Sequence, residues 1–236
     1  MTLPVISVPK FELTLPSTGK KYKYRPFLVK EEKILLIALE GGNAREILSA
    51  VKDLVSTCVE KIKIEDLTIF DLEYVFLRLR EKSIGDIIKI NLRHQNSTEC
   101  ENTQVVEVNL NEVGVIFSDK NEKKIQLTDN VGMVLKYPSI TIMDKLSDDS
   151  NESDYAMEIL ENCIDYIYDA DKIYPSKDYK KEEIHQFIDS LSHQHMEKID
   201  NFFTTLPKLE HKVTWKCEKC GKEETITLSG LSDFFI

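Results

Sequence analysis

The sequence has few glycines and no long hydrophobic run. Glycine occurs 8 times in 236 residues, below the ~7% of an average protein. No stretch approaches the roughly 18 consecutive apolar residues that predict a transmembrane helix. The first twenty residues also lack a basic start followed by a long apolar block, so we expect no secretory signal. The composition therefore predicts a globular protein that stays where it is synthesised and does not enter a membrane.

Basic residues are also fewer than acidic residues. Lys and Arg number 31 against 41 Asp and Glu, for a formal net charge of −10. A phosphate backbone attracts Lys and Arg and repels carboxylates, so this balance disfavours nucleic acid as a partner. A local basic patch is compatible with the same total.

The catalytic signature motifs are absent. The sequence contains no GxSxG, no P-loop, no GxGxxG and no HExxH, each of which places a nucleophile, a phosphate cradle or a metal on a defined turn or helix. The pair of glycines in "LEGGNA" is typical of a helix end rather than of a phosphate-binding loop. We therefore expect a protein without enzymatic activity.

The first third of the chain predicts one hairpin and three helices. Residues 10–27 alternate apolar and polar positions around the turn "PSTGK", which indicates a β-hairpin. Helical spacing then predicts helices over 28–42, 44–59 and 69–83, the second capped by Asn43 and the third by Thr68.

The hydrophobic period then changes to two. Residues 86–113 indicate a second hairpin with a polar loop, and strand-like pieces follow at 123–128 and 132–140. Further helices are expected over 144–169 and 180–206. The predicted fold class is α+β, with an N-terminal hairpin, a helical core and two β-hairpins that form a zinc-ribbon-like element. We divide the chain into 1–86 (hairpin and three helices), 87–145 (hairpin and strands), 146–207 (helices) and 208–236 (last hairpin and tail), together one composite domain.

A C-x-x-C pair near the C-terminus predicts a metal site. Cys217 and Cys220 lie between two strand-like pieces in "VTWKCEKCGKEETITL", which resembles half of a zinc ribbon. Zinc takes four ligands in a structural site. The polar loop of the 86–113 hairpin offers His94 and Cys100 as the other two. The resulting prediction is one structural zinc that joins two hairpins far apart in the sequence.

Two other interpretations of these cysteines stay open. The loop with His94 and Cys100 has no standard knuckle spacing, and it is also compatible with a degenerate knuckle that has lost its metal. A redox C-x-x-C usually lies at a helix N-terminus, whereas this pair lies between strands. Cys58 and Cys163 fall on apolar helical positions and are expected to pack in the core. With five cysteines in all, an odd number, a disulfide framework is not expected.

Three long strings resemble the T4-type bacteriophage baseplate protein family. They are "KFELTLPSTGKKYKYRPFLVKEEKILLIALE", "DLEYVFLRLREKSIGD" and "CGKEETITLSGLSDFF", in that order along the chain. The resemblance implies a non-enzymatic, late-expressed protein of a contractile-tailed phage. It implies a role in assembling the central hub of the baseplate through contacts with other hub proteins. The expected location is the host cytoplasm during assembly, and the resemblance leaves open whether the protein remains in the virion tail.

A different class of function competes with this one. A zinc ribbon in a phage protein is also typical of nucleic-acid binding or transcriptional regulation, and such a ribbon would carry clustered Lys and Arg with aromatic residues. The stretch "TWKCEKCGKEE" has a few of each, diluted by carboxylates. We therefore expect protein partners, with nucleic-acid binding as the alternative.

Overall fold

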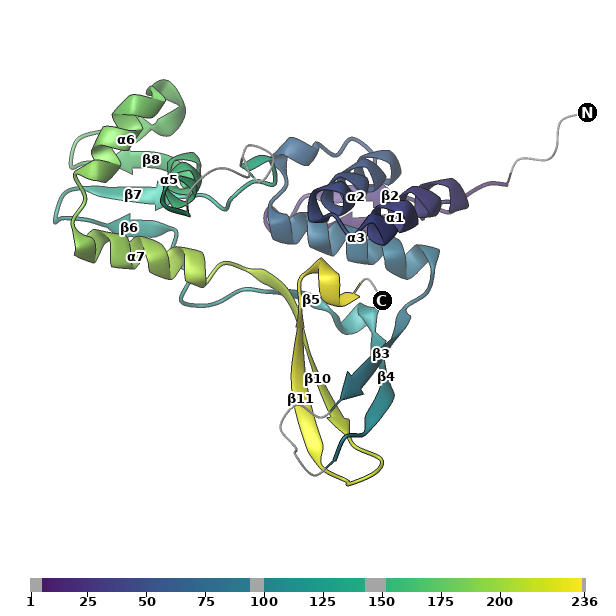
Figure 1. The fold of residues 1–236 in the computed structure, drawn as a ribbon. Coiled ribbons are helices and arrows are strands. Elements are labelled where there is room, and N and C mark those ends of the chain that lie inside the picture. The colour runs from purple at the N-terminus through teal and green to yellow at the C-terminus, as the bar shows by residue number, and fades with distance from the viewer. Residues whose placement is uncertain (1–5, 94–99, 143–151, 235–236) are drawn as a thin grey trace, which may run out of the picture. The chain divides into compact units, whose positions relative to one another are not determined.

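The chain has a mixed α+β fold. The computed structural model describes residues 6–93, 100–142 and 152–234 (Figure 1). This part of the chain contains six α-helices and four small antiparallel sheets, which confirms the predicted fold class. The chain forms two compact units, here called unit 1 (1–116 and 208–236) and unit 2 (117–207). We retain the four sequence segments as a proposal for how the chain is organised.

Unit 1 begins with the expected hairpin and three helices. The strands pair antiparallel, with Phe11 opposite Tyr24. The helices contact one another in sequence order, α1 with α2 and α2 with α3. The bounds are β1 Phe11–Thr14, β2 Lys21–Tyr24, α1 Val29–Gly41, α2 Ala44–Cys58 and α3 Ile69–Ser83.

Side-chain caps fix the start of α2 and of α3. The Asn43 side chain accepts hydrogen bonds from two backbone N–H groups of the first turn of α2. The Thr68 hydroxyl accepts one from the Asp71 N–H at 3.1 Å. Asp71 is fully buried, and its carboxylate also accepts from the Ser17 N–H in the turn of the first hairpin at 3.0 Å. Both predicted caps are confirmed, and one of them also attaches the hairpin to α3.

Two further hairpins complete unit 1. Every second residue of β3 is buried, as its alternating sequence predicts. Strand β10 pairs with both β11 and β5, so the second sheet has three strands. The bounds are β3 Ile87–Arg93, β4 Thr103–Asn109, β5 Gly114–Ile116, β10 Lys208–Lys216 and β11 Glu223–Ser229.

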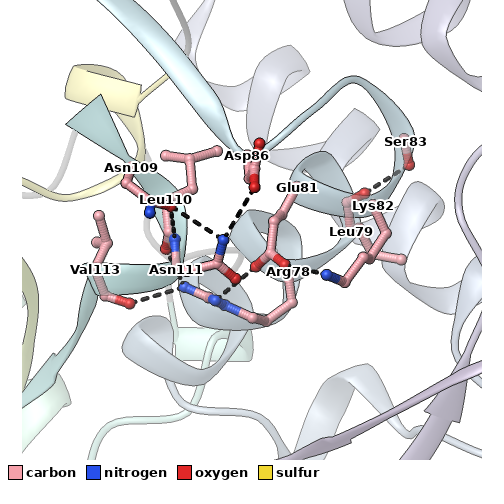
Figure 2. A network of polar contacts seen from close by, with 10 residues as sticks. All are labelled: Arg78, Leu79, Glu81, Lys82, Ser83, Asp86, Asn109, Leu110, Asn111 and Val113. Carbon is pink, nitrogen blue, oxygen red and sulfur yellow. Dashed lines mark hydrogen bonds and ion pairs between the residues drawn. The ribbon is translucent and has the colours of Figure 1, made fainter. Parts of the chain in front are cut away.

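A buried guanidinium joins α3 to the turn after β4 (Figure 2). Arg78 donates from Nη2 to the carbonyl oxygens of Leu110 at 2.5 Å and Val113 at 2.8 Å. Its Nη1 lies 2.6 Å from a Glu81 carboxylate oxygen, and Lys82 Nζ lies 2.5 Å from the other oxygen. The Arg78 and Glu81 side chains are only 13% and 2% exposed. This network gives the Val113 carbonyl a donor and gives the Leu110 carbonyl a second donor beside the Val113 N–H.

The last described residues also dock on α3. Gly230 has a φ of 71°, a left-handed conformation that suits glycine, and the short 3₁₀ helix Leu231–Phe234 follows. The Leu231 N–H donates to the Glu73 carboxylate, while burial raises the pKa of Glu73 to about 7. Phe234 is fully buried in the core cluster of unit 1, so this short helix is part of that core.

In its described residues, unit 2 packs three α-helices with a four-stranded sheet in the order β6-β7-β8-β9. Its core cluster includes Met133, Ile164, Ile199 and Phe202. The bounds are β6 Lys124–Gln126, β7 Gly132–Leu135, α5 Glu152–Cys163, β8 Ile164–Tyr168, β9 Ile173–Pro175, α6 Lys181–Asp189 and α7 His193–Thr204.

Two helix predictions in unit 2 need correction. Of the helix expected over 144–169, residues 144–151 lie outside the described part of the chain, Glu152–Cys163 form α5, and residues 164–168 form strand β8. The helix expected over 180–206 is two helices, because Ser192 accepts a hydrogen bond from the His195 N–H and caps a new start. Pairing of β8 with β7 and β9 satisfies its backbone groups, and this tertiary gain overrides the helical pattern.

Candidate metal centre

The two long hairpins of unit 1 pack with their apolar faces together. Figure 1 shows β3–β4 and β10–β11 side by side below α3, with the C-terminal ends of β3 and β10 pointing the same way. Inward-facing residues of both hairpins belong to one buried cluster: Ile88, Ile90, Leu92, Val108, Val213, Trp215 and Leu228. The shared core holds the two tips close to each other although more than a hundred residues separate them in sequence.

Three cysteines meet where the tips come together. The ligand atoms of Cys100, Cys217 and Cys220 all lie within 4.8 Å of one another. Cys100 Sγ and Cys217 Sγ are 3.9 Å apart. Both of these residues are buried, whereas Cys220 is exposed. In the described part of the chain, this is the one group of three or more His, Cys, Asp or Glu residues arranged to hold a metal ion.

The sulfur separation matches a shared tetrahedral ion. Two thiolates bound to one zinc lie about 3.8 Å apart, since each lies about 2.3 Å from the metal. A disulfide would require about 2.05 Å between the sulfurs. The observed 3.9 Å between Cys100 and Cys217 therefore excludes a disulfide and is compatible with two thiolates on one metal ion or with a thiol–thiol hydrogen bond.

A side-chain amide fastens the two tips independently of any metal. Gln104 on β4 donates from Nε2 to the Lys216 carbonyl at 3.0 Å and accepts from the Glu218 N–H at 2.9 Å. One amide thereby satisfies a backbone acceptor and a backbone donor on either side of Cys217. Asn102 Nδ2 lies 3.5 Å from Cys217 Sγ, where its N–H can stabilise a thiolate. Neither residue carried a recognisable signal in the sequence.

The turn that holds the C-x-x-C pair depends on glycine. The Gly221 N–H donates to the Cys217 carbonyl at 2.8 Å, and the Cys217 N–H donates to the Lys222 carbonyl at 2.9 Å. Gly221 has a φ of 73°, the left-handed region that residues with a Cβ adopt at a cost. These bonds fold the loop back so that both cysteines face the β3–β4 tip.

The structure places three of the four predicted metal ligands close to one another. The structure brings Cys100 to Cys217 and Cys220, whereas His94 lies outside the described residues. The donor set suits zinc, because three sulfur ligands select a soft or borderline metal over magnesium or calcium. Cys58 and Cys163 are buried away from this group, as predicted, and burial raises the pKa of their thiols to about 11 and about 12.

The chain belongs to the family of T4 bacteriophage base plate proteins, whose family model matches residues 8–236. This match covers nearly the whole chain and confirms the resemblance seen in the sequence. Neither the curated proteins nor the solved structures include a match. Among the described residues, no helix is long and apolar enough to cross a membrane.

Proposed function

We propose that the protein is a non-enzymatic component in the assembly of the central baseplate hub, acting through contacts with other hub proteins. The observation that carries the proposal is the baseplate family match over residues 8–236. The absence of catalytic motifs from the sequence agrees with a role exerted through surfaces. Assembly takes place in the host cytoplasm, after which the protein is expected in the virion tail.

Purification from phage-infected cells tests this function. A tagged copy of the chain should recover other hub components of the same phage in fixed ratio. A matched purification from uninfected cells expressing the tagged chain alone controls for adventitious capture. Quantitative mass spectrometry of purified virions then separates a retained subunit from an assembly factor. Recovery of host enzymes only, in stoichiometric amounts, would refute the hub role.

We further propose that one structural zinc binds Cys100, Cys217 and Cys220, with His94 as the fourth ligand. The sulfur geometry supports the three cysteines, and His94 is the histidine closest in sequence to Cys100. Metal-binding free energy becomes folding free energy where a site forms only on folding. The tips of two narrow hairpins have little apolar core of their own, so the ion would lock them together. Four protein ligands leave no open position for a catalytic water.

Metal analysis with ligand variants tests the zinc site. Purified protein should contain about one zinc per chain, and Cys217→Ser should lose it while α1–α3 stay folded. Cys58→Ala is the matched control, because Cys58 is equally buried but lies outside the cluster. His94→Ala tests the fourth ligand separately. Metal-free protein whose stability does not change with a chelator would show that Gln104 and the apolar core hold the tips unaided.

Nucleic-acid binding is the alternative function, and charge counts against it. Residues 216–224 contain three lysines and three glutamates, so the tip that a zinc ribbon would present to phosphates has no net positive charge. At a net charge of −10, we expect only weak, nonspecific DNA affinity at physiological salt. Gel-shift titration measures this directly. Sub-micromolar binding that falls steeply with added salt would favour the alternative.

A further inference from the structure

Helix α1 exposes large aliphatic side chains along its outer side. Val29 is 80% exposed, Ile34 and Ile37 are each 59% exposed, and Leu36 is 51% exposed. The opposite side of the helix buries Leu35 and Ala38 against the rest of unit 1, together with Glu31 in an ion pair with Arg25. A surface helix normally turns its polar residues to solvent and its apolar residues to the core. Clustered exposed aliphatic residues of this kind mark an interaction surface.

One basic and one acidic residue on this outer side lie symmetrically about its apolar centre. Lys33 and Glu40 are seven residues apart, which places them on the same side of the helix two turns from each other. The distance along the axis is about 10 Å at 1.5 Å per residue. Leu36 and Ile37 lie midway between them in the sequence. Among the described residues, neither Lys33 nor Glu40 has an ion-pair partner within the chain.

We propose that α1 is a self-association surface at which two copies of this chain pair their α1 helices antiparallel across a two-fold axis. In that arrangement Lys33 of each copy faces Glu40 of the other. Leu36 and Ile37 meet the same residues of the second copy at the axis. A two-fold interface requires one surface that is complementary to itself. A cation and an anion placed symmetrically about an apolar centre meet that requirement.

The neighbouring surface extends the apolar contact. The Phe27 N–H donates to Ser83 Oγ at 2.9 Å, which brings the end of α3 beside the start of α1. Leu28 and Ile84, the residues that follow in each segment, are 39% and 56% exposed. A 13-residue helix is only about 20 Å long, so the contact falls short of the ~800 Å² per partner of a standard interface. The dimer is therefore weak and reversible in dilute solution and is favoured at the high local concentration of an assembly.

Analytical ultracentrifugation of the purified chain tests the surface. The wild-type protein should show a monomer–dimer equilibrium over micromolar to millimolar concentrations, and Ile37→Glu should weaken it at least tenfold. Ile173→Glu is the matched control: Ile173 is 58% exposed but lies on β9 in unit 2, so it should leave the equilibrium unchanged. Circular dichroism confirms that both variants fold. A wild-type chain that stays monomeric throughout, or equal effects of the two variants, would overturn the proposal.

A charge exchange tests the antiparallel register. Lys33→Glu and Glu40→Lys should each weaken self-association about tenfold, because each variant places two like-charged pairs across the axis. An equimolar mixture of the two variants should associate as well as the wild type, since each mixed dimer restores both opposite-charge pairs. Failure of the mixture to associate would rule out this register. These measurements use the isolated chain, so their outcome is independent of the hub role and of the zinc site.

Discussion

Arg78 should be one of the most important polar side chains for the stability of unit 1. We consider Arg78→Met, which retains an apolar stem to fill the same space and removes only the guanidinium. The substitution removes the Arg78 donor from the Val113 carbonyl and one of the two donors from the Leu110 carbonyl, which still accepts from the Val113 N–H at 3.2 Å. It also leaves the Glu81 carboxylate, in a side chain only 2% exposed, with Lys82 as its remaining cation.

The expected loss can be estimated from these contacts. A hydrogen bond to a charged group contributes about 1.5–3 kcal/mol, and a buried polar group left without a partner costs about 1–3 kcal/mol. Breaking a buried ion pair by removing one partner typically costs about 3–5 kcal/mol. Lys82 still neutralises part of the Glu81 charge, which keeps the expected loss for Arg78→Met near the lower end, at about 3 kcal/mol.

Tryptophan fluorescence during urea unfolding measures this loss directly. The chain has 1 tryptophan, and Trp215 lies in the core of unit 1, so its signal reports that unit. Arg93→Met is the control, because Arg93 and its partner Glu101 are 63% and 81% exposed and such a pair contributes under about 1 kcal/mol. If Arg78→Met lost no more stability than Arg93→Met, the network would be incidental to folding. Adding Glu81→Gln to Arg78→Met should recover part of the loss, since no buried charge then remains unpaired.

Further predictions concern pH and packing. Glu73 binds a proton more readily in the folded chain than in the unfolded one, because burial raises its pKa from 4.5 to about 7. The free energy of unfolding should therefore fall by up to about 3 kcal/mol as pH rises through this range. Urea titrations of Glu73→Gln should lack this pH-dependent loss. A Glu73→Gln variant with the same pH profile as the wild type would contradict the assignment. Gly132→Ala should destabilise unit 2 by about 1–3 kcal/mol in thermal unfolding, because a Cβ there would lie 2.8 Å from the Ile125 carbonyl oxygen. Asn43→Ala should cost about 1 kcal/mol through the lost cap of α2, whereas Asn43→Asp should cost little; equal losses would argue against capping.

Much of unit 1 was predictable because its signals are local. The alternation around "PSTGK" and the helical spacing after it act over a few residues, and Asn43 and Thr68 cap helices that begin one residue later. The C-x-x-C spacing likewise named Cys217 and Cys220 as candidate ligands without any knowledge of the fold, and the structure places them in one cysteine cluster. In each case the interaction partners lie within about one turn or one hairpin of each other.

The sequence pattern predicted the wrong secondary structure where pairing within a sheet determines it. The apolar pattern of residues 164–168 was compatible with a continued helix, yet these residues pair with β7 and β9. A strand gains its hydrogen bonds from partners that can be anywhere in the chain, so its own sequence does not determine whether it forms.

The sequence alone determined the family and the fold class, and it named Cys217, Cys220 and Cys100 as candidate sulfur ligands. Only the tertiary structure decided that Cys100 lies 3.9 Å from Cys217, across a separation of 117 residues, and that Gln104 joins the two tips. It alone also showed that Arg78 bridges α3 to the turn after β4, and that α1 keeps an apolar side uncovered. The physical reason is the range of the forces involved. Turns, caps and periodicity act between neighbours in the chain, whereas burial of apolar faces brings distant segments together only once the whole core has formed.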